Sequence, residues 1–171
     1  MTIRLASRKD IDEIMYIMES VKEGIENKEW FVEDDRNYVL EHLEDREQGT
    51  VLKAVADERI VGFLIIHVPG DSKDNLGNQL HFEKKQLNEV LHMESMIVIP
   101  EARGAGIQRK LLLEAERMIP RDNDKYILAT VHPDNVYSRR NFRQMGYEEA
   151  AFAKKYGGLP RIIMKKEVAC I

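Results

Sequence analysis

One short segment of the chain combines residue types that suit an anion site. It follows an apolar stretch that stops at Pro100, and it consists of Arg103, Gly104, Ala105, Gly106, Ile107, Gln108 and Arg109. The apolar stretch predicts a strand, and apolar residues at helical spacing after position 106 predict a helix. The first amides of a helix lack intrahelical acceptors and lie at the positive end of its dipole, so they attract phosphate. The two glycines let a phosphate approach the backbone, and the two arginines add charge-assisted hydrogen bonds.

Two titratable side chains precede this segment on the same predicted strand. His92 and Glu94 are two residues apart, and the alternation of a strand places them on one face. A carboxylate or an imidazole in such a position can accept a proton from a nucleophile. Two structural alternatives stay open, because strand carboxylates also serve in ordinary ion pairs and histidines also serve in ordinary packing.

Strands and helices must alternate along the chain to position these residues. Strands are predicted at 2–6, 50–57, 60–68, 92–99, 125–131, 147–156 and 161–166. Helices are predicted at 11–24, from Asp34 or Asp35 onward, at 106–118 and at 135–145. Residues 69–88 predict a long irregular insertion with a helical turn at 80–87. This order predicts a single domain, residues 1–171, with a mixed sheet and helices on both faces.

Composition and charge argue against several classes of protein. The chain has 171 residues, 43% hydrophobic and 33% charged, with a net charge of −4. Residues 1–99 hold 12 basic and 21 acidic side chains, a net charge of −9, and residues 100–171 hold 14 and 9, a net charge of +5. This balance argues against nucleic-acid binding, and no apolar run has the length of a membrane span or the pattern of a signal peptide. The single cysteine, Cys170, suits a reducing compartment, so we expect a cytoplasmic protein without a metal site.

Two motifs carry a resemblance to a known family. Arg103 and Gly106 match a signature of Arg or Gln, two residues, Gly, one residue and then Gly or Ala, whereas Gln108 departs from its last position. Asn135 begins a second pattern, which continues with Ser138, Phe142, Gly146 and Tyr147. Together with the order of strands and helices over nearly the whole chain, these motifs resemble the GNAT superfamily of N-acetyltransferases.

The resemblance implies a fold and a cosubstrate. The fold is α/β (α+β), with a mixed, mostly antiparallel sheet of six or seven strands that splays between the fourth and fifth. The cosubstrate is acetyl-CoA, whose pantetheine arm would bond to the main chain of Met96, Ile97 and Val98, and whose pyrophosphate would lie on residues 103–109. Asn135 would contact the pantetheine or adenine part, and Arg139 or Arg140 the 3′-phosphate.

The resemblance also implies the reaction, with one departure. Transfer to an amine needs a general base, for which Glu94 is expected and His92 is the alternative, and an acid for the departing thiolate. Relatives commonly carry a tyrosine where this chain has Phe142, so Tyr137 is the expected substitute, and Ser138, Tyr147, the ammonium product and water are the alternatives. Direct attack in a ternary complex is expected, since Cys170 is badly placed to act as a nucleophile.

The acceptor is expected to be a primary amine of a small molecule or peptide, and a cationic one because the first 99 residues are acidic. A homodimer would be typical of relatives. The alternatives are a GNAT-like acyl-CoA-binding module without turnover and a different nucleotide on residues 103–109.

Overall fold

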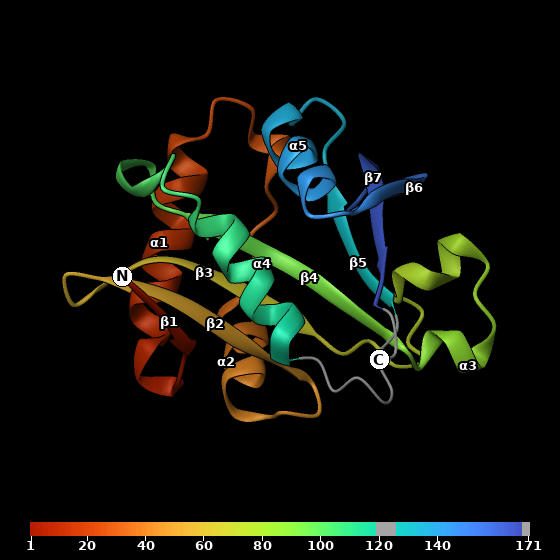
Figure 1. The fold of residues 1–171 in the computed structure, drawn as a ribbon, viewed down its shortest axis with the longest axis horizontal. Coiled ribbons are helices and arrows are strands. Elements are labelled where there is room, and N and C mark those ends of the chain that lie inside the picture. Colours follow the sequence, from red (N-terminus) through yellow and green to blue (C-terminus); the bar gives the residue numbers. More distant parts are fainter. Residues whose placement is uncertain (119–125, 169–171) are drawn as a thin grey trace. The chain divides into compact units, whose positions relative to one another are not determined.

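The computed structural model describes residues 1–118 and 126–168 (Figure 1). The strands are β1 Thr2–Leu5, β2 Gly49–Ala56, β3 Arg59–His67, β4 Val90–Val98, β5 Tyr126–Val131, β6 Glu148–Lys155 and β7 Leu159–Glu167. The helices are α1 Ile11–Gly24, α2 Arg36–Glu44, α3 Lys84–Leu87, α4 Ile107–Met118 and α5 Val136–Gln144. The predicted strands and helices are therefore confirmed. Cys170 lies outside the described residues, as does Lys125 at the expected start of β5.

The strands form a seven-stranded sheet in the order β1-β2-β3-β4-β5-β7-β6. Antiparallel pairing joins β1 with β2, β2 with β3, β5 with β7 and β6 with β7. In contrast, β4 and β5 are parallel. The parallel register covers three positions, from Val90 opposite Tyr126 to His92 opposite Leu128. The predicted α/β fold with a mixed, mostly antiparallel sheet is confirmed.

The chain divides into two compact units, and the boundary falls inside β4. The first unit comprises Met1–His67 and Glu94–Met118, and the second comprises Val68–Met93 and the described residues after position 118. The division lies one residue beyond His92, the last position at which β4 is in register with β5.

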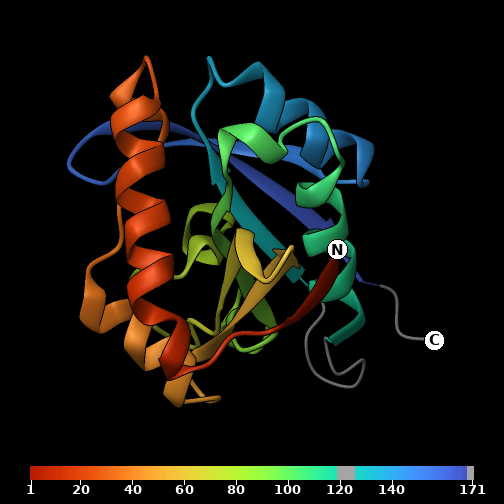
Figure 2. The ribbon, with the colours of Figure 1, turned by 90° about the vertical axis from the view of Figure 1, so that its left-hand side faces the viewer.

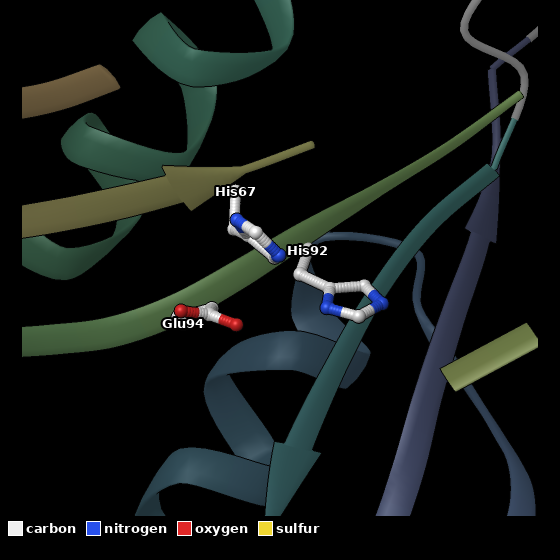
Figure 3. A group of neighbouring side chains, drawn as sticks. All are labelled: His67, His92 and Glu94. Atoms are coloured by element: carbon white, nitrogen blue, oxygen red, sulfur yellow. The ribbon is translucent and has the colours of Figure 1, made fainter. Parts of the chain in front are cut away.

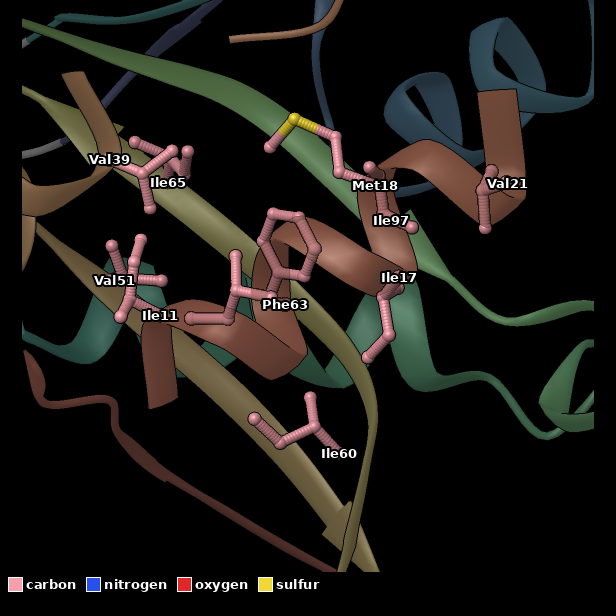
Figure 4. Close-up of a cluster of buried hydrophobic side chains, with 11 residues drawn as sticks. Ile11, Ile17, Met18, Val21, Val39, Val51, Ile60, Phe63, Ile65 and Ile97 are labelled. Carbon is pink, nitrogen blue, oxygen red and sulfur yellow. The ribbon is translucent and has the colours of Figure 1, made fainter. Parts of the chain in front are cut away.

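The helix α1 covers one face of the strands in the first unit. Ser7 and Asp10 cap the turn before it, and the Ser7 amide donates to Oδ2 of Asp10 at 2.8 Å. The apolar residues of α1 recur every three or four positions and so form one stripe. This stripe packs into a cluster (Figure 4) with the members Ile11, Ile14, Ile17, Met18, Val21, Val39, Val51, Ile60, Phe63, Ile65 and Ile97.

The helix α4 covers the opposite face of the same strands. Side chains alternate along β3, and Phe63 belongs to the α1 cluster. Its neighbour Gly62 faces the other way, since a Cβ there would lie 3.4 Å from Cγ2 of Ile107 at the start of α4. The two helices accordingly lie on either side of the strands (Figure 2). Helices on both faces of the sheet are thus confirmed for this unit.

In the second unit, the insertion at 69–88 is partly ordered into helix. It contains a 3₁₀ turn at Leu76–Leu80 and the short α3. Leu76 packs with Val90, Leu128 and Ile163 of the strands. The fully buried Asn75 braces the loop, because its Nδ2 donates to the carbonyls at 70 and 87 and its Oδ1 accepts from the amide at 77. The insertion therefore contributes buried residues to the hydrophobic core of the second unit. Among the described residues, no helix has both the length and the apolar character that a membrane crossing requires.

Candidate functional site

The loop between β4 and α4 has the backbone that an anion site needs. A 3₁₀ turn at Pro100–Ala102 leads into it, and Gly104 and Gly106 have φ of +83° and +69°. Such angles favour glycine, whereas a Cβ at either position would meet no atom within 4 Å. The carbonyl of Gly106 accepts from the amide of Lys110 at 3.0 Å, which starts α4. Exposed Arg103 and Arg109 flank a turn that is open to a ligand.

The end of β4 buries side chains and directs some of its main-chain groups away from β3. Ile97 and Val98 are buried, and Met96 is partly buried. The Ile97 carbonyl lies against β3, where a Cβ on Gly62 would approach it to 2.7 Å, and the amide of Ile99 donates to β3 at 3.0 Å. Because neighbouring residues of a strand direct their amides and carbonyls to opposite sides, the main-chain groups of Met96 and Val98 point away from β3.

Glu94 is the first residue of β4 in the first unit, and its side chain is half-buried. The phenol of Tyr38, on α2, donates a hydrogen bond to Oε2 of Glu94. Asp35 fixes this end of α2, since its side chain accepts from the amide of Tyr38 at 3.0 Å. The predicted base is thus held by a side chain 56 residues earlier in the chain.

A second carboxylate lies close to Glu94. Ser95, the next residue on β4, donates from Oγ to Oδ2 of Asp34, just before α2. Burial raises the pKa of Asp34 to about 6; the Ser95 hydrogen bond opposes this rise, and the negative charge of Glu94 adds to it. The negative charge of Glu94 beside Asp34 favours a cation near the two carboxylates.

Two histidines extend this group of residues. His42, 1% exposed, has Nδ1 2.8 Å from the carbonyl of Tyr38 and Nε2 2.9 Å from Nδ1 of His67. The ring centroids lie 4.3 Å apart for Tyr38 and His42 and 5.0 Å apart for the two histidines. His67 and Glu94 approach one another from β3 and β4 (Figure 3), with a ring nitrogen and a carboxylate oxygen within 4.8 Å. We call Asp34, Tyr38, His42, His67, Glu94 and Ser95 the acid–histidine cluster.

His92, the alternative base, is also drawn in Figure 3 and belongs to the second unit. Its ring is 4% exposed, and Nε2 accepts a hydrogen bond from the amide of Leu76 at 3.1 Å. A backbone amide can only donate, so this nitrogen uses its lone pair in the bond. While the bond is intact, Nε2 of His92 is therefore not available as a base.

In the second unit, four of the residues predicted for the site lie on α5 or at its N-cap. Asn135 caps the helix, because its Oδ1 accepts from the amide of Ser138 at 3.1 Å. Tyr137 is 74% exposed and Arg140 is exposed. Arg139 instead bonds through Nε to Glu149 at 2.9 Å and through a terminal nitrogen to a backbone carbonyl at 2.8 Å. Of the two arginines, Arg140 is thus the exposed one.

The phenylalanine that replaces the usual tyrosine is a core residue. Phe142 is 4% exposed and packs edge-on against Tyr147, with centroids 5.0 Å apart and the planes at 71°. Tyr147 is itself buried, and the ammonium of Lys166 lies 5.5 Å from its ring centroid. These two rings serve packing.

Sequence reasoning missed most of the acid–histidine cluster. Asp34, Tyr38 and His42 recur every four residues, which is the spacing of one helical face. That spacing was the available signal, but it contains nothing that points to β3 or β4. The partners of these three residues on β3 and β4 lie far away in the chain.

Comparisons with known proteins agree with this architecture. The profile of the Acetyltransferase (GNAT) family matches residues 11–147. An N-acetyltransferase of Archaeoglobus fulgidus, described as uncharacterized, is 27% identical over 140 residues, which cover 82% of this chain and 88% of the relative.

Two solved structures share the fold. Ribosomal-protein-alanine N-acetyltransferase from Brucella melitensis superposes with a TM-score of 0.73 at 22% identity and covers 98% of this chain and 100% of its own. YncA, a putative acetyltransferase of Salmonella typhimurium solved with its cofactor acetyl-CoA, has a TM-score of 0.71 at 22% identity, with coverage of 98% and 93%.

The fold and the glycine turn after β4 define a class of acetyl-transferring α/β proteins. The chain belongs to the Acetyltransferase (GNAT) family, because the family profile covers most of its length. The resemblance found in the sequence is confirmed, and with it acetyl transfer as the general activity.

Proposed function

We propose that the protein transfers the acetyl group of acetyl-CoA to a primary amine by direct attack, with Glu94 as the general base. The observation that carries this proposal is the hydrogen-bonded position of the Glu94 carboxylate inside the acid–histidine cluster. An ammonium has no lone pair, so an adjacent carboxylate that accepts its proton makes the nitrogen nucleophilic. The alternative base, His92, is disfavoured because Nε2 already accepts from a backbone amide.

The loop 103–109 is the proposed site for the pyrophosphate of acetyl-CoA. Its open glycine backbone and the start of α4 offer amide donors, and Arg103 and Arg109 offer positive charge. The main-chain groups of Met96 and Val98 that point away from β3 suit the amides of the pantetheine arm. In the second unit, exposed Arg140 suits the 3′-phosphate, and Asn135, which caps α5 through Oδ1, retains its amide nitrogen as a donor.

The proposed acceptor is a cation, either a small amine or an amine of a peptide. Asp34 and Glu94 place two acidic groups in one cluster, and residues 1–99 carry a net charge of −9 from 12 basic and 21 acidic side chains. The Brucella relative is named for acetylation of an alanine of a ribosomal protein. A peptide amine is therefore included among the proposed acceptors.

Tyr137 is the proposed acid for the departing thiolate. Its phenol is 74% exposed at the start of α5, and Phe142 and Tyr147 are committed to packing. Replacement of Tyr137 by Phe is expected to lower kcat by about a hundredfold. An unchanged kcat would assign this proton to water.

The direct test of the proposed base is Glu94→Gln, which keeps an acceptor for Tyr38 but no longer takes a proton. We expect kcat/KM for the amine to fall by about a hundredfold or more at neutral pH. The deficit is expected to shrink as the pH rises, because an amine that arrives deprotonated needs no base. The measurement is the pH profile of thiol release by the parent and variant proteins, and parallel profiles with equal rates would contradict the role.

The second candidate function is an acyl-CoA-binding module without turnover. The burial of Phe142 at the position where relatives commonly carry a tyrosine favours it, since phenylalanine supplies no proton. Calorimetry with acetyl-CoA combined with thiol-release assays distinguishes the two functions. Binding without release on any amine identifies the module.

We further propose that residues 1–171 form one catalytic domain in the cytoplasm. The family profile at 11–147 runs through both compact units, which supports a single domain. The single cysteine supports a reducing compartment. Limited proteolysis that releases a stably folded unit with full activity would argue against one domain.

A further inference from the structure

The hydrogen bonds of the histidine pair determine where its protons lie. A carbonyl oxygen can only accept, so Nδ1 of His42, 2.8 Å from the carbonyl of Tyr38, carries a hydrogen. Burial lowers the pKa of His42, which leaves its ring neutral at neutral pH with a lone pair on Nε2. That lone pair lies 2.9 Å from Nδ1 of His67. The hydrogen of this bond therefore belongs to Nδ1 of His67.

A second acceptor enforces the same tautomer. The carbonyl of Gln48 lies 3.1 Å from Nδ1 of His67 and can only accept. In the neutral ring, Nε2 of His67 then carries the lone pair. The next residue, Gly49, makes room for the pair, since a Cβ there would lie 2.7 Å from Cδ2 of His42. The chain at the start of β2 is thus shaped around the two rings.

His67 and Glu94 lie close enough for one protonated amine to contact both. A ring nitrogen of His67 and a carboxylate oxygen of Glu94 lie within 4.8 Å (Figure 3). Nδ1 donates to His42 and Gln48, so Nε2 is the ring nitrogen that carries the lone pair. An ammonium that donates two bonds of about 2.9 Å at the tetrahedral angle joins acceptors about 4.7 Å apart, a separation that this upper limit admits.

We propose that the acceptor amine binds between the carboxylate of Glu94 and Nε2 of His67, and that His67 is a second proton acceptor whose tautomer is set by His42. This inference rests on the proposed function and adds the second group that holds the amine. In the step, an N–H bond of the ammonium breaks, its electron pair stays on the amine nitrogen, and a new N–H bond forms at Nε2. The positive charge moves to the imidazolium.

The surroundings of His67 in the first unit favour that charge. Glu94 faces it from β4, while Tyr38 and His42 face it from α2. Asp34, before α2, acts on His42 as a further negative charge. The carbonyl of Gln48 accepts from the same ring. The Glu94 carboxylate and the Gln48 carbonyl therefore stabilise an imidazolium that the neutral His42 contacts.

The first test reads the tautomers directly by long-range proton–nitrogen NMR spectra of the histidine rings, with assignments from single His→Asn variants. We expect hydrogen on Nδ1 of both His42 and His67. We also expect the Nε2 resonance of His67 to shift when 1,4-diaminobutane is added in the presence of coenzyme A. Hydrogen on Nε2 of His67 in the neutral ring, or no shift with the amine, would overturn the proposal.

The second test separates proton transfer from packing. His67→Asn keeps a donor near the place of Nδ1 for His42 but has no atom at the place of Nε2. We expect kcat/KM for the amine to fall by about a hundredfold, with an unchanged Kd for acetyl-CoA. The variant should also lose the rise in rate that the parent shows between about pH 5 and pH 8, where imidazole exchanges its proton. An equal rate and an equal pH profile would overturn the proposal.

Two controls accompany that variant. His81→Asn makes the same exchange at an exposed position with φ of +56°, which asparagine tolerates, and should leave the rate unchanged. His42→Gln, which can still accept from His67, should retain more of the rate than His42→Leu. Equal losses in both His42 variants would contradict its positioning role.

The outcomes separate this inference from the proposed function. Thiol release with cationic amines in the parent protein, together with an unaffected His67→Asn variant, would reject the second acceptor alone. An Nε2 shift with 1,4-diaminobutane but no thiol release from acetyl-CoA would reject the proposed transfer and leave the amine site standing.

Discussion

Asp34 is the residue at which the demands of the site and of stability conflict. It lies on the segment before α2, accepts from Ser95 and interacts with the charge of Glu94. Burial raises its pKa to about 6, from an ordinary value of 3.8. The folded state therefore favours the protonated form. The corresponding stability is fully present below about pH 4 and is lost as the pH rises through about 6.

The variant Asp34→Asn should remove this pH dependence. Its amide oxygen can still accept from Ser95, and it carries no charge at high pH. We expect the variant to gain up to about 3 kcal/mol in free energy of unfolding over the parent at pH 8, and little at pH 4. Urea unfolding at the two pH values measures the difference. An equal difference in free energy of unfolding between variant and parent at pH 8 and at pH 4 would contradict this prediction.

At the scale of elements, the β4–loop–α4 segment was predictable because its signals are local. A run of apolar residues, Pro100, two glycines and a helical stripe lie within about twenty residues of sequence, and each acts through nearby backbone. The acid–histidine cluster was not predictable, because Tyr38 and Glu94 are 56 residues apart and His42 and His67 are 25 apart. Their meeting depends on how α2 packs on the sheet, which no local pattern encodes.

The loop element is tested by Gly106→Trp compared with Gly106→Ala. Both variants place a side chain at φ of +69° and so share the backbone strain, but the indole alone fills the space above the turn. We expect the Trp variant to lose at least about tenfold in affinity for acetyl-CoA relative to the Ala variant, because each lost charge-assisted hydrogen bond costs about 1.5 kcal/mol or more. Calorimetry measures both constants, and equal affinities would remove the pyrophosphate from this loop.

The close pairing of β3 with β4 makes a second prediction about elements. A Cβ on Gly62 would lie 2.7 Å from the Ile97 carbonyl and 3.1 Å from Cγ2 of Val98. We expect Gly62→Ala to lower the free energy of unfolding by about 2 kcal/mol, the range of overpacked cores. Gly24→Ala, at the end of α1, has nothing within 4 Å of the added Cβ and is the matched control. Equal stability of the two variants in urea would show that β3 and β4 can separate without cost.

At the scale of the whole molecule, charge is unevenly distributed along the sequence. Residues 1–99 carry −9, from 12 basic and 21 acidic side chains, and they include Asp34 and Glu94. Residues 100–171 carry +5, from 14 basic and 9 acidic side chains, and they include the loop proposed for pyrophosphate. This division matches an anionic cosubstrate with the later part of the chain and a cationic acceptor with the earlier part.

The most direct test of the proposed amine acetylation is thiol release from acetyl-CoA with acceptors of matched length and different charge. The panel consists of 1,4-diaminobutane, butylamine, 4-aminobutanoate and a short peptide with an N-terminal alanine. We expect release with at least one amine, rates that fall by about tenfold or more from the diamine to the amino acid, and a weaker contrast at high salt. Binding of acetyl-CoA in calorimetry without release on any of these amines would contradict the proposed enzyme, and fastest release with 4-aminobutanoate would contradict a cationic acceptor.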